Sequence, residues 1–423
     1  MRVVIIGGSS FSTPSLIQFL DSNETQEKIE VVLAGRSREK LAAVARASRL
    51  LVKAGVALRT KPIGPNNWRD ILDGADNVVI QVRVGGFEGR LLDETFPNKY
   101  GLCGDEGLGA GGLSAGWRTW STLATILDAI VKFCPKAFVI LLTSPLSSLV
   151  RAALQHADLN LVGICELPWT TMQGLSNILG LHTSEIQGDY LGVNHLGWFF
   201  NIRSGLRDLT NTLVDELAKS KRSFPSSEFL RKEGCFPTRY LRMHYEPDKV
   251  VAEQTSEQWR RAQVLSDIQN QSHQIYRSGK LSEIVSVLEG RATPWYSQAV
   301  GPLLLALCGQ KVEIPFFLSA RNDDYVPFLA PGDVVECQYH WANVGLQRLP
   351  LTSAPPKHVV ENLVPFVEFE RAATEAMMSR SVPGLKNALA LHPWVDDHVE
   401  LQSMIDELVT ANAALMAGSG GRR

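Results

Sequence analysis

The chain has 423 residues, of which 45% are hydrophobic and 20% are charged, and this indicates a globular protein of more than one domain. Its 42 Lys and Arg residues nearly balance its 44 Asp and Glu residues, so that the formal net charge is −2. This balance argues against nucleic-acid and membrane partners, which favour a basic surface. It still allows a small anionic substrate that is held by one or two local cations.

The six cysteines lie far apart in the sequence, and no two of them form a Cys-x-x-Cys pair. A chain of this length needs no disulfide framework, so we expect free thiols in a reducing compartment. The N-terminal apolar run is too short for a signal peptide, and no window approaches the roughly 18 apolar residues of a membrane span. We therefore expect a cytoplasmic protein.

The first third of the chain alternates short apolar runs with helical patterns. Such runs are typical of parallel strands that are buried on both faces, and repeated strand–helix units predict an α/β fold with a doubly wound sheet. The expected strands are residues 3–6, 31–34, 77–82, 137–142 and 161–164, and the expected helices are residues 14–21, 37–53 and 117–133.

The pattern becomes less regular after about residue 185, where we place a domain boundary. Residues 1–185 would form a Rossmann-type dinucleotide-binding domain, and residues 186–423 a mixed α+β domain. Within the second domain we expect a strand at 190–203, helices at 256–288, 358–379 and 382–391, and a flexible end at 418–423.

A turn of small residues joins the first strand to the first helix. A pyrophosphate needs close backbone approach and the free N–H groups of a helix start, and small residues after the first strand provide both. Ser9 and Ser12 stand where the usual Gly-x-Gly-x-x-Gly pattern has its second and third glycines, and an ordinary strand–turn–helix is the alternative. The residues assigned to the cofactor here are Gly7, Gly8, Ser9, Ser10, Phe11 and Ser12.

The second strand ends in Gly35, Arg36, Ser37 and Arg38, where NAD-binding folds place an acid that binds the ribose 2′-hydroxyl. Cations and a hydroxyl there suit a 2′-phosphate, so both NAD and NADP remain open as cofactors. Equally, the two arginines could simply begin a solvated helix. We assign Arg36 to the cofactor site.

Residues 81–94 and 100–112 mix glycines with fixed charges. We interpret these segments as loops that approach a ligand, with Arg83 and Arg90 as anion-binding side chains, and a plain surface loop is the alternative. Arg83 would contact the cofactor and Arg90 the substrate.

Polar residues follow the later strands, at the sheet edge where open α/β sheets bind ligands. Ser144 follows the fourth strand, and Cys165 and Glu166 follow the fifth. Cys165 together with His195 would give a metal ion two protein ligands and leave coordination positions for substrate, as in a catalytic site. Taken singly, a buried Cys or His is more often a core residue. Tyr240 or Tyr245, near cationic side chains, could serve as a base.

These segments together resemble glycoside hydrolase family four, and within it the 6-phospho-β-glucosidases, over nearly the whole chain. The shared features are the turn at 7–14, Arg83 through Glu94, the 104–112 segment, Cys165-x-x-Pro168, Asn194-His195-Leu196 and Tyr240-Leu241-Arg242. Arg291, Tyr296-Ser297, Asp333 through Glu336 and His392-Pro393 resemble its C-terminal landmarks.

The resemblance implies the architecture of the lactate and malate dehydrogenase superfamily and a homodimer or homotetramer. It also implies NAD, and Mn²⁺ or another divalent metal on Cys165 and His195. The sugar C3 would be oxidised, Tyr240 would remove the C2 proton, the aglycone would leave, and water addition and re-reduction would complete a hydrolysis without net redox change. Glu166 is assigned to proton transfer, and the substrate contacts are assigned to Arg90, Glu106, Ser144, Asn194 and Arg291.

The sequence departs from the family pattern at several of these positions. Ser144 replaces an Asn, Glu166 replaces an Asn or Asp, and Asp105 replaces a Gln. A 6-phosphoglycoside is therefore the leading substrate, with a carboxylated or non-phosphorylated sugar as the alternative. A 2-hydroxy-acid dehydrogenase, or a sugar or dinucleotide sensor that has lost activity, are the rival functions.

Overall fold

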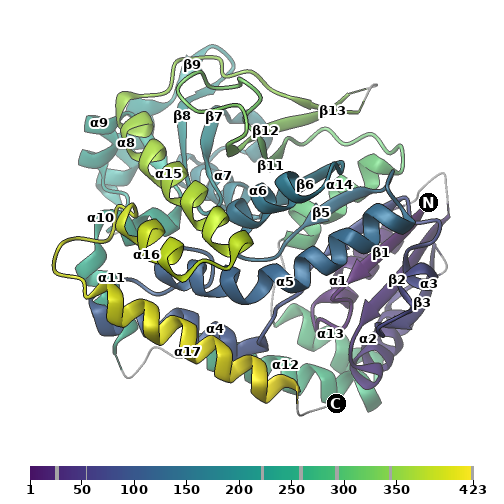
Figure 1. Cartoon of the computed structure of the whole chain (residues 1–423). Helices are drawn as coiled ribbons and strands as arrows, with labels where there is room; N and C mark the ends of the chain where they lie inside the picture. Colours follow the sequence, from purple (N-terminus) through teal and green to yellow (C-terminus); the bar gives the residue numbers. More distant parts are fainter. Residues whose placement is uncertain are drawn as a thin grey trace.

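The computed structural model describes residues 1–23, 28–53, 55–220, 223–256, 261–290, 295–342 and 345–420. Within these residues the strands form one 13-stranded sheet whose helices cover both of its faces (Figure 1).

The N-terminal half of the sheet is parallel, with the order β3-β2-β1-β4-β5-β6. The strand order reverses between β1 and β4, which creates the switch point where open α/β sheets bind ligands. The prediction of a doubly wound fold is confirmed. The strands are β1 (Arg2–Ile6), β2 (Ile29–Gly35), β3 (Val56–Pro62), β4 (Asn77–Ile80), β5 (Phe138–Leu141) and β6 (Leu161–Ile164).

The helices of this half follow the strands as crossover connections. Three of them, α1, α2 and α5, correspond to the expected helices, although α2 is shorter than the predicted 37–53 and α5 begins well before residue 117, and the apolar face of each is buried. The helices are α1 (Thr13–Ser22), α2 (Arg38–Leu51), α3 (Trp68–Leu72), α4 (Gly86–Thr95), α5 (Gly109–Phe133), α6 (Leu146–His156) and α7 (Leu167–Leu179), with short turns η1 (Phe96–Tyr100) and η2 (Thr183–Glu185).

The second half of the chain continues the same sheet with antiparallel strands, in the order β6-β11-β12-β7-β8-β10. The hydrogen-bonded sheet therefore runs through both halves. These strands are β7 (Gln187–Val193), β8 (Leu196–Ser204), β10 (Cys235–Pro237), β11 (Phe316–Arg321) and β12 (Val334–Ala342), with β9 (Arg207–Asp208) and β13 (Gly345–Arg348) paired to β8 and β12.

Helices from the second half cover the sheet and the helices of the first half. In Figure 1 the last helix, α17, lies along α4 and α5, so the C-terminal segment packs on the N-terminal half. The elements are α8 (Thr210–Lys219), α9 (Ser227–Glu233), η3 (Arg239–Leu241), α10 (Arg242–Tyr245), α11 (Pro247–Gln254), α12 (Arg261–Ser278), α13 (Leu281–Glu289), η4 (Trp295–Val300), α14 (Gly301–Leu307), α15 (Lys357–Ser379), α16 (Val382–Ala390) and α17 (Leu401–Gly420).

The single strand that was predicted at residues 190–203 is wrong. The segment is a hairpin of β7 and β8 whose two-residue turn is Asn194-His195. His195 has a φ of 69°, in the left-handed region that few non-glycine residues adopt, although Asn, Asp and His do so more readily than most. The apolar residues on both sides of this turn hide it in the sequence pattern.

The prediction of ligand-approaching loops at 81–94 and 100–112 is also wrong for much of these segments. Residues from Gly86 onwards form α4, and α5 begins at Gly109. A Cβ on Gly104 would lie 2.1 Å from the carbonyl oxygen of Glu94, and one on Gly111 would lie 2.2 Å from that of Asp93. Gly111 therefore lets α5 pack against the backbone of α4, and Gly104 does the same for the segment that precedes α5.

Prediction and structure also differ at three smaller points. The helix predicted at 256–288 divides into α12 and α13, with Gly279 between them, and residues 257–260 lie outside the described part. Strand β3 was not predicted, because apolar and polar side chains alternate only weakly along its central residues Leu-Arg-Thr-Lys. Helix α17 continues to Gly420, past the start of the flexible end expected at 418–423, and residues 421–423 lie outside the described part.

No disulfide joins the six cysteines, all of which are described and buried. Among the described helices, none has the length and hydropathy needed to cross a bilayer.

Candidate active site

Two adjoining cavities lie at the carboxyl ends of the parallel strands. One, of about 290 Å³, is bounded by the ends of β5 and β6 and by the β7–β8 turn, and we call it the strand-end cavity. The other, of about 560 Å³, follows the turn after β1 and the end of β2, and we call it the glycine-turn cavity. The two share the walls made by Ser10, Phe11, residues 81–84 and Phe87.

The turn after β1 places small residues against the glycine-turn cavity. Gly7 has a φ of 91°, and a Cβ there would lie 2.7 Å from the carbonyl oxygen of Gln81. Gly8 packs behind the turn, where a Cβ would lie 2.9 Å from the Cα of Leu33. Of the predicted residues, Gly7, Ser9, Ser10 and Phe11 line this cavity, while Ser10, Phe11 and Ser12 line the strand-end cavity.

Ser12 gives an independent indication that this turn fits a dinucleotide. Its hydroxyl is buried and has no hydrogen-bond partner among the described residues, although it stands at the start of α1 and at the cavity wall. An unsatisfied buried hydroxyl is unfavourable unless a ligand atom completes it. A polar ligand at this helix start would do so.

At the end of β2, only some of the residues predicted to contact the cofactor reach the glycine-turn cavity. Gly35 and Arg36 line the glycine-turn cavity, and so does Lys40, which the sequence interpretation missed. The Ser37 hydroxyl accepts a hydrogen bond from the backbone N–H of Lys40 and caps α2. Arg38 is exposed and lies outside the cavity lining.

Cys165 and His195 both line the strand-end cavity, at the end of β6 and in the β7–β8 turn. Burial lowers the pKa of His195 to about 4, so the imidazole is neutral, as a metal ligand must be. Burial, together with the carboxylates of Glu166 and Glu336, raises the pKa of the Cys165 thiol. The thiol Sγ lies 3.4 Å from Oε2 of Glu166. A cation between thiol and imidazole would favour the thiolate.

These donors fit a metal ion that is only partly coordinated by protein. His195 Nδ1 is buried without a hydrogen-bond partner, 3.9 Å from Oδ1 of Asp105. In the described part of the chain, no group of three or more His, Cys, Asp and Glu side chains could hold a metal. Two protein ligands would leave positions open for substrate oxygens, as catalytic metals require.

The turn that carries His195 is held from several sides. The Asn194 N–H donates to the Ser147 hydroxyl at 2.7 Å, and its side-chain amide donates to Glu336 Oε1 at 3.3 Å. Tyr190 donates to the other oxygen of Glu336 at 2.7 Å. Burial raises the pKa of Glu336 to about 7, against the effect of these two hydrogen bonds. Sequence reasoning included Glu336 only as a family landmark.

Tyr240, in η3, faces the same cavity and stacks on the imidazole of His195, with ring centroids 4.4 Å apart. Its hydroxyl accepts a hydrogen bond of 3.0 Å from Arg261 Nη2. Burial and the carboxylate of Asp105 raise the pKa of Tyr240, while the Arg261 guanidinium acts in the opposite direction. Arg261 was missed because it lies 21 residues from Tyr240 in an ordinary helical pattern.

The alternative base, Tyr245, lies elsewhere. Its hydroxyl accepts a hydrogen bond from Trp198 Nε1 at 3.0 Å and lies 2.7 Å from His358 Nε2. Tyr245 lines neither the strand-end cavity nor the glycine-turn cavity.

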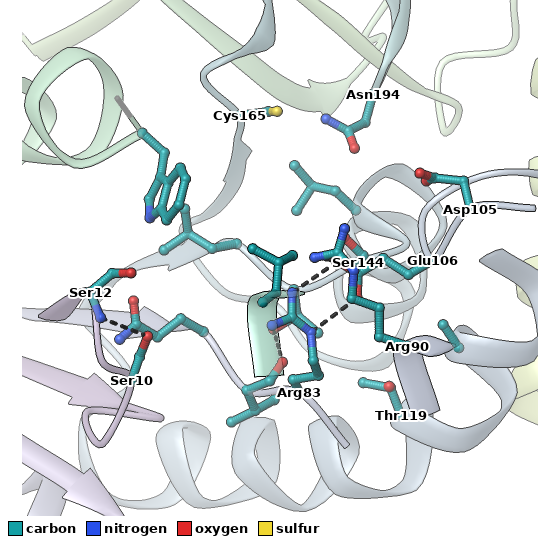
Figure 2. Close-up of a pocket in the computed structure, with 18 of the residues that line it drawn as sticks. Ser10, Ser12, Arg83, Arg90, Asp105, Glu106, Thr119, Ser144, Cys165 and Asn194 are labelled. Atoms are coloured by element: carbon teal, nitrogen blue, oxygen red, sulfur yellow. Dashed lines mark hydrogen bonds and ion pairs between the residues drawn. The ribbon is translucent and has the colours of Figure 1, made fainter. Parts of the chain in front are cut away.

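Two arginines meet on one carboxylate in the strand-end cavity (Figure 2). Arg83 makes two hydrogen bonds to Glu106, of 3.0 and 2.9 Å, and Arg90 lies 3.0 Å from the same carboxylate. Burial raises the pKa of Glu106, but the two guanidinium groups outweigh it and bring the value to about 2. Arg90 is also paired with Glu94 at 2.8 Å.

The predicted substrate residues are largely gathered in this one cavity. Arg90, Glu106, Ser144, Asn194 and Glu166 all line it, and Figure 2 shows Cys165 and Asn194 at one end with Ser10 and Ser12 away from them. Arg291 lies outside the described residues.

Comparison with known proteins agrees with this geometry. The chain is 25% identical over 437 residues to a probable 6-phospho-beta-glucosidase of Bacillus subtilis, an alignment that covers 98% of this chain and 97% of that protein. The solved 6-phospho-beta-glucosidase of Thermotoga maritima with NAD and glucose-6-phosphate has a TM-score of 0.87 at 24% identity, covering 98% of this chain and 99% of that one. A 6-phospho-alpha-glucosidase from gut microorganisms, in complex with NAD and Mn²⁺, has a TM-score of 0.84 at 19% identity, covering 98% of each chain.

A lactate dehydrogenase of Cryptosporidium parvum has a TM-score of 0.52 at 14% identity, covering 89% of this chain and 98% of that one, and shows the shared fold alone. The predicted dehydrogenase-like architecture is thus confirmed, whereas the family models indicate a different activity.

The model of the Family 4 glycosyl hydrolases matches residues 2–181, and the model of their C-terminal domain matches residues 190–395. The chain belongs to the family 4 glycosyl hydrolases and is a glycosidase.

Proposed function

We propose that the chain hydrolyses 6-phosphoglucosides, with a preference for the β linkage, using a nicotinamide dinucleotide and a divalent metal such as Mn²⁺. The observation that carries this proposal is the convergence of Cys165, His195 and Tyr240 on one cavity that adjoins the glycine-turn cavity. Relatives named 6-phospho-glucosidases, some in complex with NAD, Mn²⁺ or glucose-6-phosphate, support it. We further propose that the enzyme acts in the cytoplasm as a homodimer or homotetramer.

Each group has a role set by its position. When bound, the dinucleotide would supply a reversible hydride acceptor and the metal a Lewis acid, which together would make the sugar C2–H acidic. Cys165 and His195 would hold the metal. The glycine turn with Ser10, Phe11 and Ser12 would hold the dinucleotide, and Ser10 and Phe11 belong to the walls that the two cavities share.

Tyr240 is the base of this proposal. Its hydroxyl faces the cavity and already accepts a hydrogen bond from Arg261, which would stabilise the phenolate and lower the barrier to taking a proton from C2. Glu166, beside the Cys165 thiol at the opening of α7, would pass a proton to the leaving aglycone oxygen.

The ion pairs of Arg90 affect which kind of sugar the strand-end cavity can bind. Arg90 is already paired with Glu94 and Glu106, and Glu106 also binds Arg83. A phosphate here would therefore compete with two carboxylates for Arg90. This pairing favours, as a second candidate, a non-phosphorylated sugar cleaved by the same residues. A uronic sugar belongs to the same alternative, although its carboxylate would meet the same competition.

A glycoside panel tests the proposal. The purified enzyme would be assayed with NAD⁺, Mn²⁺ and a reductant on p-nitrophenyl β- and α-glucoside 6-phosphates, the unphosphorylated glucosides and the glucuronides. We expect turnover of the β-linked phosphate, its loss in Tyr240→Phe, and no net NADH. Turnover of only unphosphorylated or uronic glycosides would establish the second candidate. Net NADH from a 2-hydroxy acid, without glycoside cleavage, would contradict both.

A further inference from the structure

We propose that the end of β2 forms a site for the 2′-phosphate of NADP, so that the chain binds NADP at least as tightly as NAD. The proposal rests on the proposed function only for the assignment of the glycine-turn cavity to a nicotinamide dinucleotide. The site consists of Arg36 and Lys40, at the end of β2 and in the first turn of α2.

The position that selects NAD in this fold is unable to do so here. Folds of this type bind the ribose 2′-hydroxyl of NAD through an Asp or Glu at the end of the second strand. In this chain the strand ends in Gly35, and a Cβ there would lie 3.2 Å from the Ser9 hydroxyl and 3.4 Å from a Leu41 methyl. The backbone of β2 therefore approaches the glycine turn closely, with little space for a carboxylate side chain at Gly35.

The charge of the glycine-turn cavity is one-sided. Its described lining includes three cationic side chains, Arg36, Lys40 and Arg83, and no Asp or Glu. Arg83 is neutralised by its two hydrogen bonds to Glu106. No ion pair joins Arg36 or Lys40 to any residue in the part of the chain that the structure describes, so two positive charges there remain uncompensated.

The one acid close to this pair in sequence is held by another residue. Glu39 lies 2.9 Å from Arg277 of α12 and does not line the cavity. The Ser37 hydroxyl is likewise used, because it caps α2 by accepting from the Lys40 N–H. This cap fixes the first turn of α2 beside the cavity, with Lys40 in it.

Two unpaired cations around the ribose are the chemistry that binds a phosphate monoester. A guanidinium can form two charge-assisted hydrogen bonds to phosphate, and an ammonium adds a point charge. The N-terminal end of the 14-residue helix α2 contributes further positive potential. The 2′-hydroxyl of NAD would gain none of these ionic contacts.

Calorimetric titration of the full chain with NADP⁺ and NAD⁺ tests the inference. We expect a Kd for NADP⁺ equal to or lower than that for NAD⁺, and binding of 2′,5′-ADP at least tenfold tighter than that of 5′-AMP. Arg36→Ala and Lys40→Ala should each raise the Kd for NADP⁺ about tenfold, or about 1.4 kcal/mol, and should leave the Kd for NAD⁺ within about twofold of its original value. Arg38→Ala is the matched control, because it removes an exposed cation of the same helix turn that lies off the cavity.

The inference is overturned if NAD⁺ binds tenfold or more tightly than NADP⁺, or if the two alanine variants weaken both dinucleotides equally. Melting curves of the variants exclude misfolding as the cause. The outcome is separable from that of the proposed function. Hydrolysis supported by NAD⁺ with no preference for 2′,5′-ADP refutes only the 2′-phosphate site, whereas tight 2′,5′-ADP binding without glycoside hydrolysis refutes only the proposed function.

Discussion

The imidazole of His195 and the phenol of Tyr240 lie nearly parallel, with an interplanar angle of 6° and a centroid separation of 4.4 Å. They belong to the β7–β8 turn and to η3, and Thr238 joins these two segments. Its hydroxyl donates to the His195 carbonyl at 2.6 Å, its N–H donates to Gly197 O at 2.9 Å, and its own position immediately precedes η3. The proposed metal ligand and the proposed base therefore share one support.

Replacing Thr238 by Val should misplace this pair while keeping the side-chain shape. The variant leaves the His195 carbonyl without its donor, a loss of about 1–3 kcal/mol for a buried group. We expect weaker Mn²⁺ binding, followed by electron paramagnetic resonance of free Mn²⁺, and a kcat lowered about tenfold or more with a smaller change in KM. Thr238→Ser retains the hydroxyl and serves as the control. Equal Mn²⁺ affinity in the Val and Ser variants would show that Thr238 does not position the site.

Removal of either proposed metal ligand should abolish metal binding without unfolding the N-terminal half. Cys165→Ser and His195→Ala each remove one of two protein donors, and the remaining one cannot retain the ion against dialysis. We expect no stoichiometric Mn²⁺ after dialysis, loss of glycosidase activity, and unchanged dinucleotide binding by calorimetry. Cys134→Ser, a buried cysteine outside both cavities, is the control. Wild-type turnover in either ligand variant after chelation and dialysis would refute the metal assignment.

The carboxylate of Glu106 should make stability depend on pH. Its pKa is lowered from 4.5 to about 2 because Arg83 and Arg90 outweigh the effect of burial. A depressed folded-state pKa stabilises the fold above about pH 4.5, and this contribution is lost as the pH falls toward 2. Glu106→Gln should therefore lower the free energy of unfolding by about 3 kcal/mol at pH 7, and by less than half of that at pH 3.

Urea denaturation of both proteins at the two pH values measures this difference. Glu88→Gln, a substitution of an exposed residue on the same helix as Arg90, is the control and should hardly change the free energy of unfolding at either pH. A Glu106→Gln effect that is the same at pH 7 and pH 3 would show that the ion pairs contribute nothing to stability.

The close packing of α4 and α5 predicts opposite effects for two Gly→Ala substitutions in helices. A Cβ on Gly111 would meet the carbonyl oxygens of Asp93 and Asp105 at 2.2 and 2.3 Å, so Gly111→Ala should destabilise the protein by about 3 kcal/mol or more. Gly174, in α7, has no atom within 4 Å of its Cβ position. Gly174→Ala should stabilise by about 0.5–1 kcal/mol, as expected for a helix interior. Thermal unfolding of both variants decides, and a tolerated Gly111→Ala would contradict the packing account.

The parallel half of the fold was predictable because each buried strand is a continuous apolar run. The run at 161–164 coincides with β6, which places Cys165 at the strand end where the cavity forms. The Asn194-His195 turn was not predictable as a turn, since its apolar flanks read as one strand and the left-handed conformation at His195 depends on contacts with Ser147, Glu336 and Thr238.

The supporting residues were harder to find than the ligands. Arg261 reaches the Tyr240 hydroxyl from α12, and Glu336 reaches Asn194 across 142 positions from β12. Neither has a local pattern that separates it from an ordinary charged residue, because its role comes from long-range packing of the sheet. The glycines at 104–112 were misinterpreted as part of a ligand loop for the same reason. The sequence alone does not distinguish a glycine that permits close backbone contact from one that lines a ligand loop.

Hydrolysis in D₂O tests the central claim most directly. If Tyr240 removes the C2 proton of the sugar and later returns one, that proton exchanges with solvent, and the product sugar should carry deuterium at C2, visible by mass and proton spectra. Tyr240→Phe should retain binding and lose both hydrolysis and C2 exchange. A displacement by carboxylates never breaks the C2–H bond. Hydrolysis that leaves C2 fully protonated, with undiminished turnover in Tyr240→Phe, would contradict the proposed chemistry and its base.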